Sequence, residues 1–329
     1  MGSPFTAQLC QLAAERLDAA TFVGRTVLSW PGQPRADALP LRLMGALHAL
    51  VLSGRSPELA TVYPPQPVPH QDVVWQALES AFVDHGDFIG DTLTSPPQTN
   101  EVARSSALLG GFLTIASETG RPLALSELGA STGLNLLWDR FHYTINDKMW
   151  GDGSSAVHLE PEWSGPAPPV EQELEVVDRA ACDLNPLNPA EPADRLRLLS
   201  YVWADQSERI SRLNAAMDLA AAADVRVEGD DAASWIEHRL AGQPDGSVHV
   251  VYHTVFWHCV ARATRERIQQ LLEAAGAEAT ADRPLAWLRL EADSKKPGAG
   301  LTLTTWPEGR TRLLARADFH GRWVAWLPS

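Results

Sequence analysis

The stretch Leu123-Ala-Leu-Ser-Glu-Leu-Gly-Ala-Ser-Thr-Gly-Leu-Asn-Leu-Leu137 decides the expected fold. Its apolar first half predicts a buried strand that ends near Glu127, and the Gly-x-Ser-x-Gly sequence that follows predicts a sharp turn into a helix. Gly129 and Gly133 suit such a turn, and they let a ligand approach the backbone. The first turn of the helix offers free N–H groups and the positive end of a dipole. The stretch is therefore typical of the first strand–turn–helix unit of a cofactor-binding sheet.

Glu127 lies directly before this turn and indicates the kind of ligand. A carboxylate there repels the pyrophosphate of a dinucleotide, whereas it attracts the sulfonium and ammonium groups of S-adenosylmethionine. Together with Gly129, Ser131 and Gly133 it resembles the first motif of class I S-adenosylmethionine-dependent methyltransferases, acid-x-Gly-x-Gly-x-Gly, with serine at the middle position. The alternative is a tight turn that binds nothing.

Two further stretches extend the resemblance. Gln98-Thr-Asn-Glu-Val-Ala-Arg104 and Cys182-Asp-Leu-Asn-Pro-Leu187, with the stretch from Glu127 to Asn135, resemble a bacterial family of uncharacterised proteins known as DUF2332. This resemblance covers nearly the whole chain. It implies a fold and names no substrate.

The composition limits the partners. The chain has 329 residues, of which 45% are hydrophobic and 21% charged, enough for a sizeable core in one large or two ordinary domains. We expect a cytoplasmic protein with no membrane partner, because no apolar run approaches about 20 residues and Met1–Cys10 lacks an export pattern. The formal net charge of −14 disfavours nucleic acid and favours a small-molecule acceptor. Three cysteines without C-x-x-C spacing indicate neither disulfides nor a metal site.

Helical patterns separated by proline and glycine predict an all-helical N-terminal domain over residues 1–118. Strands and helices alternate from 123 to 290 and predict a mostly parallel sheet in a second domain, 119–329, with an insertion at about 142–177. The last two expected strands, 301–306 and 323–327, lack a helix between them and predict an antiparallel terminal hairpin, as the methyltransferase resemblance implies. The expected fold is an α/β, Rossmann-like class I methyltransferase sheet with a helical N-terminal domain.

The end of the second strand should carry an acid that accepts hydrogen bonds from both ribose hydroxyls of the cofactor. Asp147 lies at the separation from Gly129 expected of an uninterrupted unit. Asp183 requires the 142–177 segment to be an insertion, and we favour it because Asn185-Pro186 behind it makes a compact turn. Without a ligand, Asp183 would cap its own turn and Asp147 would lie at a solvated hairpin tip.

Other candidate cofactor-binding residues follow neighbouring strands or precede the first one. Asp230 and Asp231 follow the third expected strand, at 225–227, and either contact the adenine or cap the next helix. Asn135 lies in the first turn of the helix after Gly133. Asn100 and Glu101 open the helix before the first strand, where they either hold the methionine end of the ligand or act as caps.

The fourth strand ends at Tyr252-His-Thr254, the position that faces a transferable methyl group. His253 and Thr254 are the catalytic candidates, with His253 as a general base. A buried, hydrogen-bonded structural histidine is the alternative. The sequence thus favours an S-adenosylmethionine-dependent methyltransferase that acts on a small molecule. A cofactor-binding regulatory protein without activity and an NAD(P)-dependent oxidoreductase with a degenerate turn are the alternatives.

Overall fold

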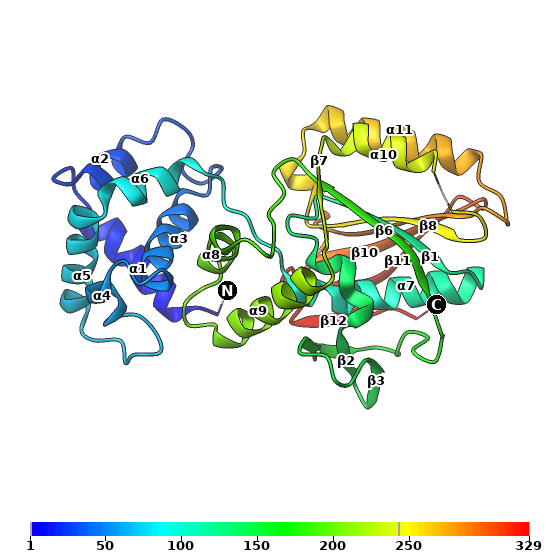
Figure 1. Ribbon diagram of the computed structural model, residues 1–329, viewed down its shortest axis with the longest axis horizontal. Coiled ribbons are helices and arrows are strands. Elements are labelled where there is room, and N and C mark those ends of the chain that lie inside the picture. Colours follow the sequence, from blue (N-terminus) through cyan, green and yellow to red (C-terminus); the bar gives the residue numbers. More distant parts are fainter. Residues whose placement is uncertain (1, 243, 329) are drawn as a thin grey trace. The chain divides into compact units, whose positions relative to one another are not determined.

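The computed structural model describes residues 2–242 and 244–328, which form two compact units (Figure 1). The helical unit runs to Thr99 and includes Ala190–Asn214. The sheet unit comprises Asn100–Pro189 and the chain from Ala215 onward. The boundary therefore differs from the expected one after residue 118, because the chain from Asn100 already belongs to the sheet unit.

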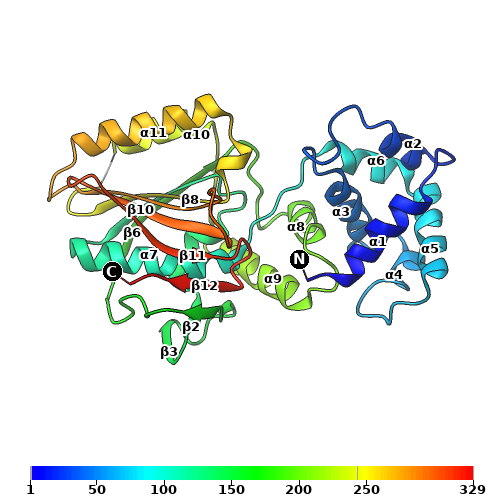
Figure 2. The ribbon, with the colours of Figure 1, turned by 180° about the vertical axis from the view of Figure 1, so that it is seen from behind.

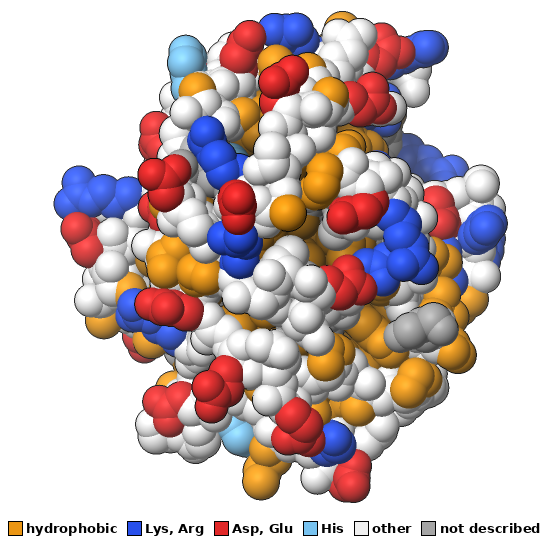
Figure 3. Space-filling model, turned by 90° about the vertical axis from the view of Figure 1, so that its right-hand side faces the viewer, with side chains coloured by type: hydrophobic (Ala, Val, Ile, Leu, Met, Phe, Trp, Pro, Cys, Tyr) orange, Lys and Arg blue, Asp and Glu red, His pale blue; other side chains and the backbone are white. Residues whose placement is uncertain are grey.

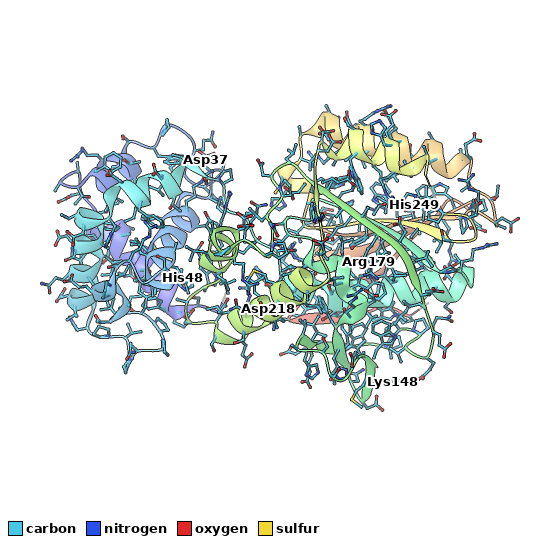
Figure 4. The ribbon with its side chains drawn as sticks, viewed as in Figure 1. Asp37, His48, Lys148, Arg179, Asp218 and His249 are labelled. Carbon is cyan, nitrogen blue, oxygen red and sulfur yellow. The ribbon has the colours of Figure 1, made fainter. Side chains whose placement is uncertain are left out.

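The helical unit is built from short helices with a common apolar core. These are α1 (Pro4–Arg16), α2 (Phe22–Leu28), α3 (Leu39–Leu52), α4 (Pro57–Ala60), α5 (Gln71–Asp84), α6 (Gly86–Thr94), α8 (Pro192–Ser200) and the start of α9 (Ser207–Ala222). α3 is buried all round at its centre, since every residue from Arg42 to Leu50 is buried. His48, labelled in Figure 4, is buried in the same helix and its Nδ1 lies 3.3 Å from the Ser200 carbonyl.

The sheet unit alternates strands with helices and 3-10 turns. Its elements before α9 are η1 (Val102–Arg104), α7 (Ser105–Thr119), β1 (Leu123–Leu128), η2 (Leu134–Arg140), β2 (His142–Ile145), β3 (Lys148–Gly151), β4 (His158–Leu159), β5 (Glu162–Ser164) and β6 (Val176–Asp183). Those after α9 are β7 (Glu228–Gly229), α10 (Ala232–Leu240), β8 (Val248–Thr254), η3 (Trp257–Cys259), α11 (Arg262–Ala277), β9 (Leu285–Glu291), β10 (Ala299–Trp306), β11 (Arg310–Ala317) and β12 (Trp323–Trp326).

The main sheet has the strand order β5-β12-β11-β10-β9-β8-β1-β6-β7. The run from β9 to β7 is parallel, which confirms a large, mostly parallel α/β sheet. β10, β11 and β12 add antiparallel strands, so β11 lies between the two strands that the sequence predicted as the last. The strand order reverses between β1 and β8. On one side of β1 the sheet continues with β6 and β7, and on the other side it continues with β8 and β9.

Helices cover both faces of this sheet. Figures 1 and 2 show α10 and α11 on one face and α7 on the other. Gly111 lets α7 approach closely, because a Cβ there would lie 2.6 Å from Leu288 Cδ1. Successive strand residues point to opposite faces, so Glu127 and its register partner Tyr252 share the α7 face. His253 therefore points to the face covered by α10 and α11.

The segment between β1 and β6 contains a small second sheet. β2 pairs with β3 and β4, whereas β5 joins the far edge of the main sheet beside β12. β6 is consequently the strand next to β1, as the choice of Asp183 requires. The third expected strand is displaced, because β7 comprises Glu228–Gly229 and not residues 225–227.

Candidate functional site at the carboxyl ends of β1, β6 and β8

The three motif stretches converge at one edge of the sheet. Leu134 N donates to Asn100 Oδ1 at 3.1 Å, which joins the stretch before α7 to the turn after β1. Leu187 N donates to the Ser131 carbonyl at 3.1 Å, which joins the stretch after β6 to the same turn. This edge is also where the strand order reverses, the place at which open α/β sheets bind their ligands.

The turn after β1 has the backbone that its sequence predicts. Gly129, Ser131 and Gly133 all have positive φ values, of 69°, 57° and 73°. A non-glycine residue with such a φ is uncommon and needs support. The Asp183 side chain supplies it, since Ser131 N donates to Asp183 Oδ2 at 2.9 Å. The side-chain oxygens of Ser131 and Thr132 are buried without a hydrogen-bond partner among the described residues.

The space in front of the two glycines is filled by protein side chains. A Cβ on Gly129 would lie 2.1 Å from the Phe256 ring. A Cβ on Gly133 would lie 2.8 Å from Val225 and 2.9 Å from Val227. The expectation that Gly133 leaves room for a ligand is therefore wrong, because valine side chains occupy that room. Ligand contact with Gly129 requires the Phe256 ring to move aside.

Glu127 is a buried acid at the end of the central strand, with only 2% of its surface exposed. The Tyr252 hydroxyl donates to its Oε2 at 3.2 Å, the one hydrogen bond to this carboxyl within the described ranges. Burial raises the pKa of Glu127 to about 8, and the charge of Asp183 adds to this, whereas the Tyr252 hydrogen bond and Arg104 oppose it. The carboxyl is thus mostly protonated at neutral pH until a cation stabilises its ionised form.

Asn100, Glu101 and Asn135 form a hydrogen-bonded group under this turn. Asn100 caps η2 by accepting a hydrogen bond from Leu134 N. This N–H at the start of the helix, which was expected to be free for a ligand, therefore already has a partner. Glu101 is the N-cap of η1 and accepts from Ala103 N at 3.2 Å. Asn135 Oδ1 accepts from Ser105 at 2.8 Å. All three are nearly buried, and Asn100 and Glu101 make the capping contacts that the sequence offered as their alternative role.

The structure places the candidate acids differently. Asp183 lies at the end of β6, beside the turn, and its Oδ1 also accepts from Asn185 N at 2.9 Å. Asp147 lies exposed between β2 and β3 in the small sheet, outside this edge. Asp231 caps α10 through Ala233 N and Ser234 N. Asp230 is exposed next to it, and its backbone N donates to the Asp183 carbonyl at 3.1 Å.

His253 is a buried structural residue on the opposite face of the sheet from Glu127. Its Nδ1 lies 2.7 Å from Glu291 Oε1, and its Nε2 accepts from Trp287 Nε1 at 3.2 Å. Burial lowers its pKa, although the Glu291 carboxylate opposes this. Both ring nitrogens are thus engaged, and this geometry favours the structural alternative over a general base. Thr254, the other catalytic candidate, lies at the end of β8 with its carbonyl 3.4 Å from Arg104 Nη1.

Two parts of this site were not predicted from the sequence. The first is Tyr252. Side chains alternate along β8, so Tyr252 and His253 point to opposite faces, and Tyr252 shares a face with its register partner Glu127. The second is the loop between β11 and β12. Arg104 Nε donates to the Phe319 carbonyl at 2.8 Å, and His320 Nδ1 lies 3.6 Å from Glu101 Oε2. No local sequence signal indicates that this loop reaches η1.

Surface charge around the sheet unit is mixed. Figure 3 shows acidic and basic side chains interspersed with apolar ones over one face. Within residues 2–242 and 244–328, no three His, Cys, Asp or Glu side chains gather in a metal-binding group. None of the described helices has the length and apolar character that a membrane span needs.

Residues 1–326 match the family model described as "Uncharacterized protein conserved in bacteria (DUF2332)". The chain belongs to the DUF2332 family. The match covers all three motif stretches that meet at the β1 turn. No curated protein and no solved structure matches this DUF2332 chain.

Proposed function

We propose that this DUF2332 protein binds S-adenosylmethionine at the carboxyl ends of β1, β6 and β8 and transfers its methyl group to a small molecule. The observation that carries the proposal is Glu127, a buried carboxyl at the end of the central strand, where the strand order reverses. The ionised form of a buried acid with a single hydrogen bond from Tyr252 is costly unless a cation accompanies it. The ammonium group of this cofactor is such a cation.

Further polar groups of the turn suit the ribose of the cofactor. Asp183 beside the turn retains lone pairs for ribose hydroxyls after its two backbone contacts. The buried, unpartnered oxygens of Ser131 and Thr132 lie in the same turn, and ligand hydroxyl or amine groups would satisfy them. Phe256 lies over Gly129 and would have to rotate as the ligand enters.

When bound, the cofactor supplies an electrophilic methyl group, so the residues of this chain need to position and to exclude water. Glu127 would hold the ammonium group of the ligand, and Asp183 would hold its ribose hydroxyls. Tyr252 orients the Glu127 carboxyl, and Phe256 would shield the reacting groups from solvent. His253 takes no part in proton transfer, because Glu291 and Trp287 occupy its ring nitrogens.

Thermal unfolding tests the proposal. A ligand at about 100 times its dissociation constant stabilises the folded state by roughly 2.7 kcal/mol, which corresponds to a rise of several degrees in Tm. We expect S-adenosylmethionine and S-adenosylhomocysteine to cause this rise, and NAD and NADP to cause none. Asp183→Ala should remove most of it, whereas the matched control Asp147→Ala should keep it. A rise with NAD alone would favour the oxidoreductase alternative instead.

Methyl transfer from labelled cofactor to small molecules of a cell extract then separates the enzyme from the regulatory alternative. Binding without any transfer would favour the regulatory protein.

A further inference from the structure

Arg289 on β9 stands apart from other half-buried arginines of the sheet unit. Arg179 is paired with Asp139 and Arg316 with Asp293, each at 2.8 Å (Figure 4 labels Arg179). Arg289 makes a single hydrogen bond to the described residues, from Nη2 to Thr304 Oγ1 at 3.1 Å. Its Nε is buried and has no partner among them. Most of the five donors of this guanidinium are therefore unused by the protein.

Arg289 lies on the face of the sheet that α10 and α11 cover. The guanidinium carbon lies 3.9 Å from the centre of the Trp287 ring, so the group is stacked on an aromatic plane. His253 and Thr302 are its register partners on the two neighbouring strands. Gly300 lies two residues before Thr302 on β10 and has no side chain to cover the guanidinium.

A half-buried guanidinium with unused donors is costly unless an anion or water completes its hydrogen bonds. Burial lowers the pKa of Arg289 to about 10, although Glu291 opposes this, which agrees with a poorly solvated cation. From this geometry we infer that Arg289, stacked on Trp287, binds the carboxylate group of a small molecule.

The charges nearby favour a carboxylate over a dianionic phosphate. Glu291 lies two residues along the same face, and its hydrogen bonds with His253 and two backbone N–H groups lower its pKa against the effect of burial, so it is negative at neutral pH. Arg316, the other cation near Gly300, is committed to Asp293 and to backbone carbonyls. One available guanidinium balances one negative charge, and its planar fork matches the two carboxylate oxygens.

This site lies two strands from β1, a lateral distance of about 10 Å along the sheet, but on the face opposite Glu127. A small acid held at Arg289 would have to pass the end of β8 to meet a ligand at β1. That the carboxylate belongs to the methyl acceptor rests on the proposed function, whereas carboxylate binding itself does not.

Thermal unfolding with sodium acetate, sodium phosphate and sodium chloride at equal ionic strength tests the inference on the full chain. We expect acetate to raise the Tm saturably, by about 2 to 4 °C, in the wild type. The same rise is expected in Arg267→Met, a control that removes an exposed arginine of α11. Arg289→Met should show no rise, and Arg289→Lys, which keeps the charge without the fork, should need about tenfold more acetate.

Several results would overturn the inference. Equal acetate responses in the wild type and both Arg289 variants would place the anion elsewhere. A response to phosphate and none to acetate would make this a phosphate site. No acetate response in the wild type, with a lowered Tm of Arg289→Met in chloride, would show that protein and water already satisfy the guanidinium. Absence of a Tm rise with S-adenosylmethionine in the wild type, together with an intact acetate response, would refute the proposed function alone.

Discussion

Replacement of Glu127 by glutamine should make the protein more stable at neutral and alkaline pH, with an effect that grows as pH rises. The folded-state pKa of about 8 lies above the ordinary value of 4.5, so the unfolded chain loses its proton first. Between these two values, rising pH lowers the free energy of unfolding of the wild type, and above pH 8 the loss is complete. A pKa rise of this size corresponds to a loss on the order of 5 kcal/mol.

Urea unfolding of wild type and Glu127→Gln from pH 5 to pH 9 measures this loss, because other groups titrate alike in both proteins. The difference in unfolding free energy should grow steadily from pH 5 and level off near pH 8. Glu278→Gln, which changes an exposed glutamate of the sheet unit, serves as the matched control and should follow the wild-type profile. A constant difference between Glu127→Gln and wild type across this range would refute the account of a buried, mostly protonated carboxyl.

Two further substitutions separate packing from chemistry. Gly133→Val should lower the free energy of unfolding by about 3 kcal/mol or more in urea, because its Cβ would lie 2.8 Å from Val225 and φ is 73°; wild-type stability would contradict the described packing. His253→Ala should cost about 3 kcal/mol, since it removes the imidazole partner of the buried Glu291 carboxylate and leaves the Trp287 N–H without its acceptor. A stable His253→Ala variant that loses only turnover would restore the general-base hypothesis.

The parallel sheet was predictable because its strands are apolar and bounded by strong turn signals. The stretch from Leu123 to Gly133 predicted both the strand and the positive-φ turn, because glycine adopts positive φ without the steric penalty of a Cβ. The choice of Asp183 over Asp147 as the residue at the end of the second strand depended on recognising an insertion, and the structure pairs β6 directly with β1.

Long-range contacts account for what the sequence could not predict. The register that puts Glu127 beside Tyr252 and turns His253 to the other face is set by pairing between distant strands. Phe256 and Val225 fill the space in front of the glycines, and no local pattern indicates that they reach it. Arg289 was likewise unremarkable in sequence, because its lack of a partner is a property of packing.

Isothermal titration of S-adenosylmethionine at pH 6.5, in buffers of different ionisation enthalpy, tests the central claim most directly. Glu127, with a pKa of about 8, is almost fully protonated at that pH, and the ligand ammonium is charged. Binding of the cation to the carboxylate should therefore release about 0.9 proton for each ligand bound. Glu127→Gln should bind more weakly and release none. Absence of binding, or binding without proton release that Glu127→Gln leaves unchanged, would contradict a cofactor site at Glu127.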